Sequence, residues 1–118
     1  MNHESFRKYC LAKKGTTESL PFDDKTLVFK VLGKMYALVS LDSPVLRVSL
    51  KCEPELAEEL RARYEGVIPG YHMNKRYWNT VTYDDSIGEK TLKEWIDHSY
   101  SLVVKGLSQT SRNSLGFV

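Results

Sequence analysis

Three consecutive segments in the first half of the chain alternate apolar and polar residues with a period of two. They span residues 27–31, 35–41 and 45–51, and their apolar positions are Leu27, Phe29, Val31, Met35, Ala37, Val39, Leu41, Leu46, Val48 and Leu50. In a strand this period places all the apolar side chains on one face. Turn residues separate the segments at Gly33-Lys34 and at Asp42-Ser43-Pro44. The pattern predicts an antiparallel meander of three strands with one covered face.

Apolar residues at helical spacing predict one helix before these strands and another near the C-terminus. The first helix carries Phe6, Tyr9 and Cys10 at positions i, i+3 and i+4. The C-terminal helix runs from about residue 87 to 106, and its apolar face is formed by Leu92, Trp95, Ile96, Tyr100 and Val103.

A further helix follows the three strands. It starts at Pro54, because proline is tolerated at the first helical position, and it ends at Gly66. Within it, Arg61 lies three residues after Glu58, which is the spacing of an exposed ion pair on a helix surface. We therefore expect Arg61 to face solvent.

The segment 70–79 combines aromatic, cationic and amide side chains more densely than any other part of the chain. It follows Ile68-Pro69 and reads Gly-Tyr-His-Met-Asn-Lys-Arg-Tyr-Trp-Asn. It is too polar for a core strand, while its large rigid side chains are unusual for a simple connection. We expect a short strand over 71–73, a projecting turn over 74–76, and a strand over 77–83 that continues into β-branched residues.

The order of these elements is α-β-β-β-α-β-β-α, and it lacks the strand–helix–strand alternation of a parallel sheet. It predicts an α+β fold, a two-layer sandwich in which helices cover one face of an antiparallel sheet. We expect residues 1–107 to form a single domain. The segment 16–26 is then a connection, and residues 108–118 form a loose C-terminal tail.

Composition narrows the class of protein. The chain has 118 residues, of which 42% are hydrophobic and 27% are charged, and these are ordinary values for a globular protein. No apolar run approaches the roughly 18 residues that span a bilayer, and the first residues do not have the pattern of a secretory signal. Cys10 and Cys52 are isolated thiols. We expect a cytoplasmic protein that does not enter a membrane.

Several motifs together resemble the MmcQ/YjbR family. The resemblance covers about residues 6–107, and it rests on the segments LVFKV (27–31), GKMYAL (33–38), VSLKC (48–52), PELA (54–57), PGYHMNK (69–75), WNTV (78–81) and IDHSY (96–100). It implies a fold akin to the frataxin-like and secretion-chaperone-like sandwiches. It also implies a predicted DNA-binding protein with a double-wing motif.

The residues allow two basic wings. One wing is the hairpin around Leu32-Gly33, flanked by Lys30 and Lys34, and the other is the turn around Asn74. We expect nucleic-acid contacts from Lys30, Lys34, Asn74, Lys75, Arg76 and Tyr77, with support from Tyr71, His72, Trp78 and Asn79. Four or five phosphate contacts would give weak, salt-sensitive binding of DNA with little sequence selectivity.

A second interpretation stays open. The lysines at the hairpin tips are then ordinary charges that guard the sheet edges. Tyr71 and Tyr77 would instead line an aromatic groove for a partner protein, as in a chaperone-like module. The net charge of +2 does not decide between the two interpretations, because nucleic-acid affinity depends on clustered cations. The sequence also leaves open whether the protein is a monomer or a dimer.

Catalytic and metal-binding motifs are not expected. Asp97, His98 and Ser99 contain an acid, a base and a hydroxyl, but successive helical residues point about 100° apart and cannot form a relay. The three histidines and two cysteines do not have a metal-ligand spacing. We expect no catalytic residues, no metal and no cofactor.

Overall fold

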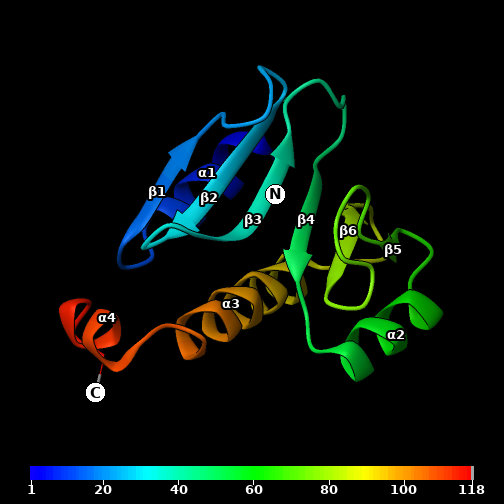
Figure 1. Ribbon diagram of the computed structural model, residues 1–118. Coiled ribbons are helices and arrows are strands. Elements are labelled where there is room, and N and C mark those ends of the chain that lie inside the picture. The colour runs from blue at the N-terminus through cyan, green and yellow to red at the C-terminus, as the bar shows by residue number, and fades with distance from the viewer. Residues whose placement is uncertain (118) are drawn as a thin grey trace.

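A six-stranded antiparallel sheet forms one layer of the protein (Figure 1). The computed structural model describes residues 1–117. The strands are β1 (Thr16–Ser19), β2 (Thr26–Val31), β3 (Lys34–Ser40), β4 (Arg47–Lys51), β5 (Val67–Pro69) and β6 (Trp78–Thr82). They lie in the order β1-β2-β3-β4-β6-β5, and each neighbouring pair is antiparallel.

Helices form the second layer. They are α1 (His3–Leu11), α2 (Pro54–Arg63), α3 (Glu89–Lys105) and α4 (Gln109–Ser114). Figure 1 shows α1 behind strands β1 to β3 and α3 running toward α4. Buried residues of α1, α2 and α3 join the inward-facing residues of the strands in one core, which includes Phe6, Phe29, Val48, Leu60, Val81 and Ile96. The predicted two-layer α+β sandwich with an antiparallel sheet is confirmed.

One strand was not predicted. Residues 16–19, expected as a connection, form the edge strand β1, in which Thr17 pairs with Lys30 of β2. The segment has no apolar alternation, because its inward side chains make polar contacts. Glu18 forms an ion pair with Arg7 of α1, and the Thr16 hydroxyl hydrogen bonds to the Tyr36 hydroxyl at 2.9 Å.

The expected strand over residues 71–73 is wrong. The strand lies four residues earlier, in β5, and residues 70–77 form a loop between β5 and β6. The Gly70 amide donates to the Trp78 carbonyl at 2.7 Å and closes the loop. His72 has a positive φ of 59°, which a strand residue does not adopt.

The C-terminal segment also differs from the expected loose tail. Residues 109–114 form α4, and Leu115 and Phe117 pack against the core. The Phe117 ring lies 6.4 Å from the Tyr100 ring. Two apolar residues in a polar stretch are therefore enough to attach this segment. Residue 118 lies outside the described part of the chain.

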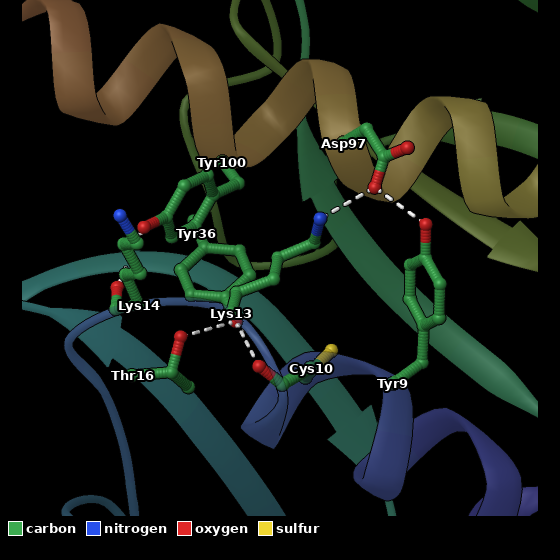
Figure 2. Close-up of polar contacts among 8 residues, drawn as sticks. All are labelled: Tyr9, Cys10, Lys13, Lys14, Thr16, Tyr36, Asp97 and Tyr100. Atoms are coloured by element: carbon green, nitrogen blue, oxygen red, sulfur yellow. Dashed lines mark hydrogen bonds and ion pairs between the residues drawn. The ribbon is translucent and has the colours of Figure 1, made fainter. Parts of the chain in front are cut away.

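Polar contacts join α1 and the turn that follows it to α3 and β3 (Figure 2). The Tyr9 hydroxyl and the Lys13 ammonium both donate to Asp97 Oδ1, at 2.7 and 2.5 Å. The Tyr100 hydroxyl donates to the Lys14 carbonyl at 2.6 Å, and the Tyr36 hydroxyl donates to the Cys10 carbonyl at 3.1 Å. Each of these groups has a partner within the fold, so we interpret the cluster as structural.

The three residues Asp97, His98 and Ser99 point to three different places. Asp97 binds residues of the α1 region, while His98 Nε2 accepts a hydrogen bond from the Glu53 amide at 3.3 Å. The Ser99 hydroxyl lies under the sheet, where it donates to the Tyr36 carbonyl. They do not converge on one another, as the helical spacing predicts.

Candidate nucleic-acid interface on the open face of the sheet

The face of the sheet opposite the helices is the candidate site. Within residues 1–117, no helix covers this open face. Val28, Leu38 and Trp78 form a small apolar cluster on it, with Met35 and Met73 packed alongside. Its polar positions carry hydroxyl groups, among which those of Ser49 and Thr80 hydrogen bond to each other across β4 and β6 at 2.9 Å. The open face is therefore partly covered and partly available to a ligand.

The first predicted wing is the β2–β3 hairpin. Its tip residues Leu32 and Gly33 have positive φ angles of 46° and 82°, as in the mirror-image turns that favour tight hairpins. Lys30 pairs with Met35, which belongs to the cluster on the open face, and cross-strand partners share a face. Lys34 is exposed at the turn. The hairpin thus carries one lysine on the open face and one at its end.

The second predicted wing is not a projecting hairpin. The loop 70–77 folds back over the open face, where the Tyr71 amide donates to the Thr80 hydroxyl at 3.0 Å. Met73 packs on the apolar cluster. The Lys75 ammonium donates to the Gly70 carbonyl at 3.3 Å, so this cation stays close to its own loop.

The remaining predicted contact residues of this loop are at its surface. Asn74 Oδ1 accepts from the Arg76 amide at 3.0 Å, which closes a tight turn. The Arg76 guanidinium lies 5.6 Å from the centre of the Tyr77 ring. Asn74, Arg76 and Tyr77 are all exposed. Their side chains are available to a ligand without rearrangement of the backbone.

Arg61 holds the base of this loop. Its side chain donates to Asn79 Oδ1 at 2.6 Å, to the Trp78 carbonyl at 3.2 Å and also to the Lys75 carbonyl. Asn79 is buried and donates in turn to the Ala57 carbonyl of α2 at 3.3 Å. The expectation of an exposed Arg61–Glu58 pair is wrong, because the carbonyls of the loop offer the guanidinium several acceptors in one place.

The β2–β3 hairpin and the loop 70–77 lie at the same end of the sheet. Lys34 begins β3, Lys51 ends the neighbouring antiparallel β4, and Lys51 pairs with Trp78 at the start of β6. The two predicted wings therefore lie on either side of one surface at this end of the sheet, next to the open face. Both the hairpin and the loop contribute cations to it.

A groove of about 510 Å³ runs across the open face. Strands β2, β3, β4 and β6 form its floor, which includes Ser40, Ser49 and Thr80. Phe22 lies at the β2 side, and Tyr71, His72 and Met73 lie at the β6 side. The sequence does not indicate Phe22, Arg47, Ser49 or Thr80 as site residues, because only the sheet order brings them together.

Tyr71 and Tyr77 do not share this groove. Tyr77 lines a separate depression of about 420 Å³ with Asn74, Trp78 and Lys51. The single groove between two tyrosines that the second interpretation expects is thus not formed. Tyr71 instead lines the groove on the open face, which Phe22 also lines.

Within residues 1–117, side-chain ion pairs are confined to the helix layer and the sheet edge beside it, while cations without an ion pair lie on both faces. The ion pairs between side chains are Arg7–Glu18, Lys8–Glu4, Lys13–Asp97 and Lys93–Glu89, and each involves a residue of α1, α3 or the turn after α1. On the open face, its rim and its hairpin end, seven cations make no ion pair with any residue from 1 to 117. They are Lys25, Lys30, Lys34, Arg47, Lys51, Lys75 and Arg76.

Two carboxylates line the same groove. Asp23 accepts from the amides of Lys25 and Thr26 at 2.9 and 2.8 Å, and these hydrogen bonds hold the pKa of Asp23 below its usual value. Asp42 is exposed in the β3–β4 turn. Both lie at the end of the sheet away from the two basic segments, so the open face has a basic end and an acidic rim.

The described residues contain no group of three or more His, Cys, Asp or Glu side chains that could hold a metal ion. Cys10 and Cys52 are buried, and burial raises the pKa of their thiols to about 12 and about 11. In residues 1–117 no helix is long and apolar enough to cross a membrane.

Comparison with known proteins identifies relatives along almost the whole chain. A family model described as YjbR matches residues 11–102. The uncharacterized protein YjbR of Escherichia coli is 37% identical over 108 residues, which cover 92% of each chain. The uncharacterized protein YbdF of Escherichia coli is 34% identical over 107 residues, which cover 91% of this chain and 88% of YbdF.

Solved structures agree with the fold. The crystal structure of the Deinococcus radiodurans protein DR2400 has a TM-score of 0.91 and 42% sequence identity, and the match covers 99% of this chain and 89% of that one. A crystal structure of a Pseudomonas syringae protein has a TM-score of 0.72 and 31% identity, with 86% of this chain and 98% of that one covered.

Proposed function

The chain belongs to the YjbR family, and from this starting point we propose that it binds nucleic acid through the open face of its sheet. Binding is weak, largely independent of sequence and not accompanied by catalysis. It takes place in the cytoplasm, where the two free thiols remain reduced. DNA is the first ligand to test.

The observation that carries the proposal is the set of seven cations on and around the open face that form no ion pair within residues 1–117, although helix cations such as Arg63 and Lys90 are also unpaired. The ion-paired cations belong to the helix layer and the strand edge beside it, whereas Lys30, Lys34 and Arg76 and their neighbours on the open face have no acidic partner among residues 1–117. Unpaired cations gathered on one surface attract a polyanion and release its counterions on binding. A net charge of +2 conceals this surface, because acidic residues elsewhere offset it.

The predicted wing residues keep their roles in this proposal, in a changed geometry. Lys30 and Lys34 contact phosphates from the β2–β3 hairpin, and Lys75 and Arg76 contact them from the folded loop. Asn74 and Tyr77 are exposed beside these cations and assist. Tyr71, His72, Trp78 and Asn79 shape the loop. The two wings are thus two contact points at one end of the sheet.

A salt titration tests the proposal. Fluorescence polarisation of labelled duplex and single-stranded oligonucleotides is measured at several salt concentrations for the wild type and for the double variant Lys75→Ala/Arg76→Ala. We expect the variant to bind all sequences more weakly and to reduce the slope of log K against log salt by about one unit for each lost phosphate contact.

A matched double variant provides the control. Lys8→Ala/Lys90→Ala removes two exposed lysines from the helices. It has the same change in net charge, and we expect a smaller loss of affinity and an unchanged salt slope. Equal effects of the two variants, or no binding by the wild type at low salt, would contradict the proposal.

A partner-protein function has one observation in its favour. Leu20, Phe22, Leu41 and Val45 are exposed apolar residues in loops at the acidic end of the sheet. The Leu41 amide donates to the Lys25 carbonyl at 2.7 Å and joins two of these loops. Binding of a protein to such a surface would barely respond to salt, which separates it from the nucleic-acid function.

A further inference from the structure

The groove on the open face lies between two exposed aromatic side chains. Phe22 is 63% exposed and Tyr71 is 62% exposed, although aromatic side chains of this size are usually covered. The sheet order places β3 and β4 between them, so the two rings stand on opposite sides of a floor. At about 510 Å³ the groove is within the size range of small-ligand sites.

The Tyr71 side is held in place before any ligand arrives. The Tyr71 amide is fixed to the Thr80 hydroxyl at 3.0 Å. The Arg47 guanidinium lies 5.9 Å from the centre of the Tyr71 ring, and the His72 ring lies 4.0 Å from it. A ring that is already oriented loses little conformational freedom when a ligand stacks on it.

Backbone strain in the same loop supports this interpretation. His72 adopts the left-handed conformation with a φ of 59°, which is rare for a residue with a side chain. A Cβ atom added at Gly70 would lie 2.7 Å from the Cβ of Trp78, so the loop also requires a glycine there. Strain of this kind persists where the surrounding structure enforces it, and it is concentrated at ligand-binding segments.

The polar groups of the groove select the class of ligand. Lys25 and Arg47 line it and form no ion pair in the described chain, Ser49 and Thr80 supply hydroxyls on the floor, and the carboxylates of Asp23 and Asp42 lie at its acidic rim. Aromatic faces next to cations and hydroxyls match a chain of flat bases joined by phosphates. A duplex stacks its bases against one another and leaves these rings without a partner.

We propose that this groove binds the unpaired bases of a single-stranded nucleic acid, one base stacking on Tyr71 and the neighbouring phosphate contacting Arg47. The inference rests on the proposed function and makes it more specific. Phe22 supports a second base at the β2 side of the groove. The basic end of the sheet continues the path for the phosphates beyond the groove.

The test compares single strands with a duplex. Oligo(dT) and oligo(U) of about 12 nucleotides, which is within the site size of single-strand binding folds, and a DNA duplex of the same length are titrated by fluorescence polarisation at low salt. We expect Tyr71→Ala to weaken binding of the single strands about 10-fold and to leave duplex binding within about twofold. Tyr71→Phe keeps the ring and should bind like the wild type.

The outcomes separate this inference from the function on which it rests. If duplex binding survives while Tyr71→Ala leaves single-strand binding unchanged, the inference is wrong and the proposed function stands. If the wild type binds neither probe, both are wrong. A loss confined to oligo(dT) or to oligo(U) supports the inference and shows which of the two strands uses the groove.

A second variant, Phe22→Ala, keeps the inference testable if Tyr71→Ala does not fold. Phe22 lies in the loop between β1 and β2, whereas Tyr71 lies in the loop between β5 and β6, so Phe22→Ala changes a different loop. It should weaken single-strand binding about fivefold or more with an unchanged thermal melt. If a folded Phe22→Ala variant binds single strands as the wild type does, the proposal that bases stack on both sides of the groove is wrong.

Discussion

Arg61 is the residue whose environment differs most from its sequence pattern. It lies on an amphipathic helix at ion-pair spacing, yet its guanidinium donates to Asn79 and to carbonyls at the base of the loop 70–77. Nothing in the helical pattern of α2 could indicate this, because the acceptors come from a loop whose conformation is set by the sheet. The contact role of Lys75 and Arg76 stays a prediction, while the expected strand before them is wrong.

We expect Arg61→Ala to lower the free energy of unfolding by about 1–3 kcal/mol, because it leaves the buried Asn79 without one of its hydrogen-bond partners. Urea denaturation measures this effect. Arg63→Ala removes an exposed arginine from the same helix and serves as the control, with an expected change of within about 0.5 kcal/mol. Equal effects of the two substitutions would show that Arg61 does not anchor the loop.

At the scale of elements, the predictions succeeded where periodicity was strong. The three alternating segments became β2, β3 and β4, and the apolar stripes of 6–10 and 92–103 became parts of α1 and α3. The strand β1 and the helix α4 were not predicted, because each packs against the rest of the protein through few apolar side chains. The strand placed at 71–73 failed because aromatic residues with strand propensity occupy a loop that is fixed by tertiary contacts.

Ser99 shows how one helix fixes the register of the sheet. Opposite β2, the register of β3 shifts between Phe29 and Lys30, so that Tyr36 is an extra residue of β3. The buried Ser99 hydroxyl donates to the Tyr36 carbonyl at 2.5 Å and accepts from the Lys51 amide at 2.9 Å. It thereby connects α3 to two strands at an irregular point.

Ser99→Ala should lower the free energy of unfolding by about 1–3 kcal/mol, because the buried Tyr36 carbonyl and the partly buried Lys51 amide lose a partner. Ser101→Ala changes an exposed serine two residues along the same helix and should have little effect. Both are measured by urea denaturation. A neutral Ser99→Ala variant would mean that the bulge is stable without this hydroxyl.

At the scale of the whole molecule, the two faces of the sheet carry different features. The helix-covered face holds the core and the side-chain ion pairs, and the open face holds the groove and none of the ion pairs found within residues 1–117. The sequence predicted the sandwich, since each apolar stripe demands a covering layer. It could not predict the groove, because Phe22, Arg47 and Tyr71 are far apart in sequence and meet only through the strand order β2-β3-β4-β6.

The raised pKa values of Cys10 and Tyr9 make the free energy of unfolding depend on pH in the alkaline range. Burial raises the pKa of Cys10 to about 12 from its usual 9.0, and burial together with the Asp97 contact raises the pKa of Tyr9 to about 12 from 10.0. The unfolded chain therefore releases these protons first as pH rises. Their contribution to stability is complete below about pH 9 and is lost as the pH rises toward 12.

We accordingly expect the urea midpoint to be constant near neutral pH and to fall above about pH 9. The variant Cys10→Ala lacks one of the raised groups and should show a shallower fall, whatever its stability at neutral pH. An alkaline profile that is flat up to about pH 10.5 would contradict the burial of these groups.

The proposed function requires that nucleic acid binds to the open face of the sheet. The most direct measurement is a two-dimensional amide NMR titration of the labelled protein with a short oligonucleotide at low salt. We expect shifts in β4, in β6, in the loop 70–77 and at the β2–β3 turn, with α1 and α3 unchanged and the shifts reversed by added salt. No shifts at all, or shifts centred on α1 and α3, would contradict it.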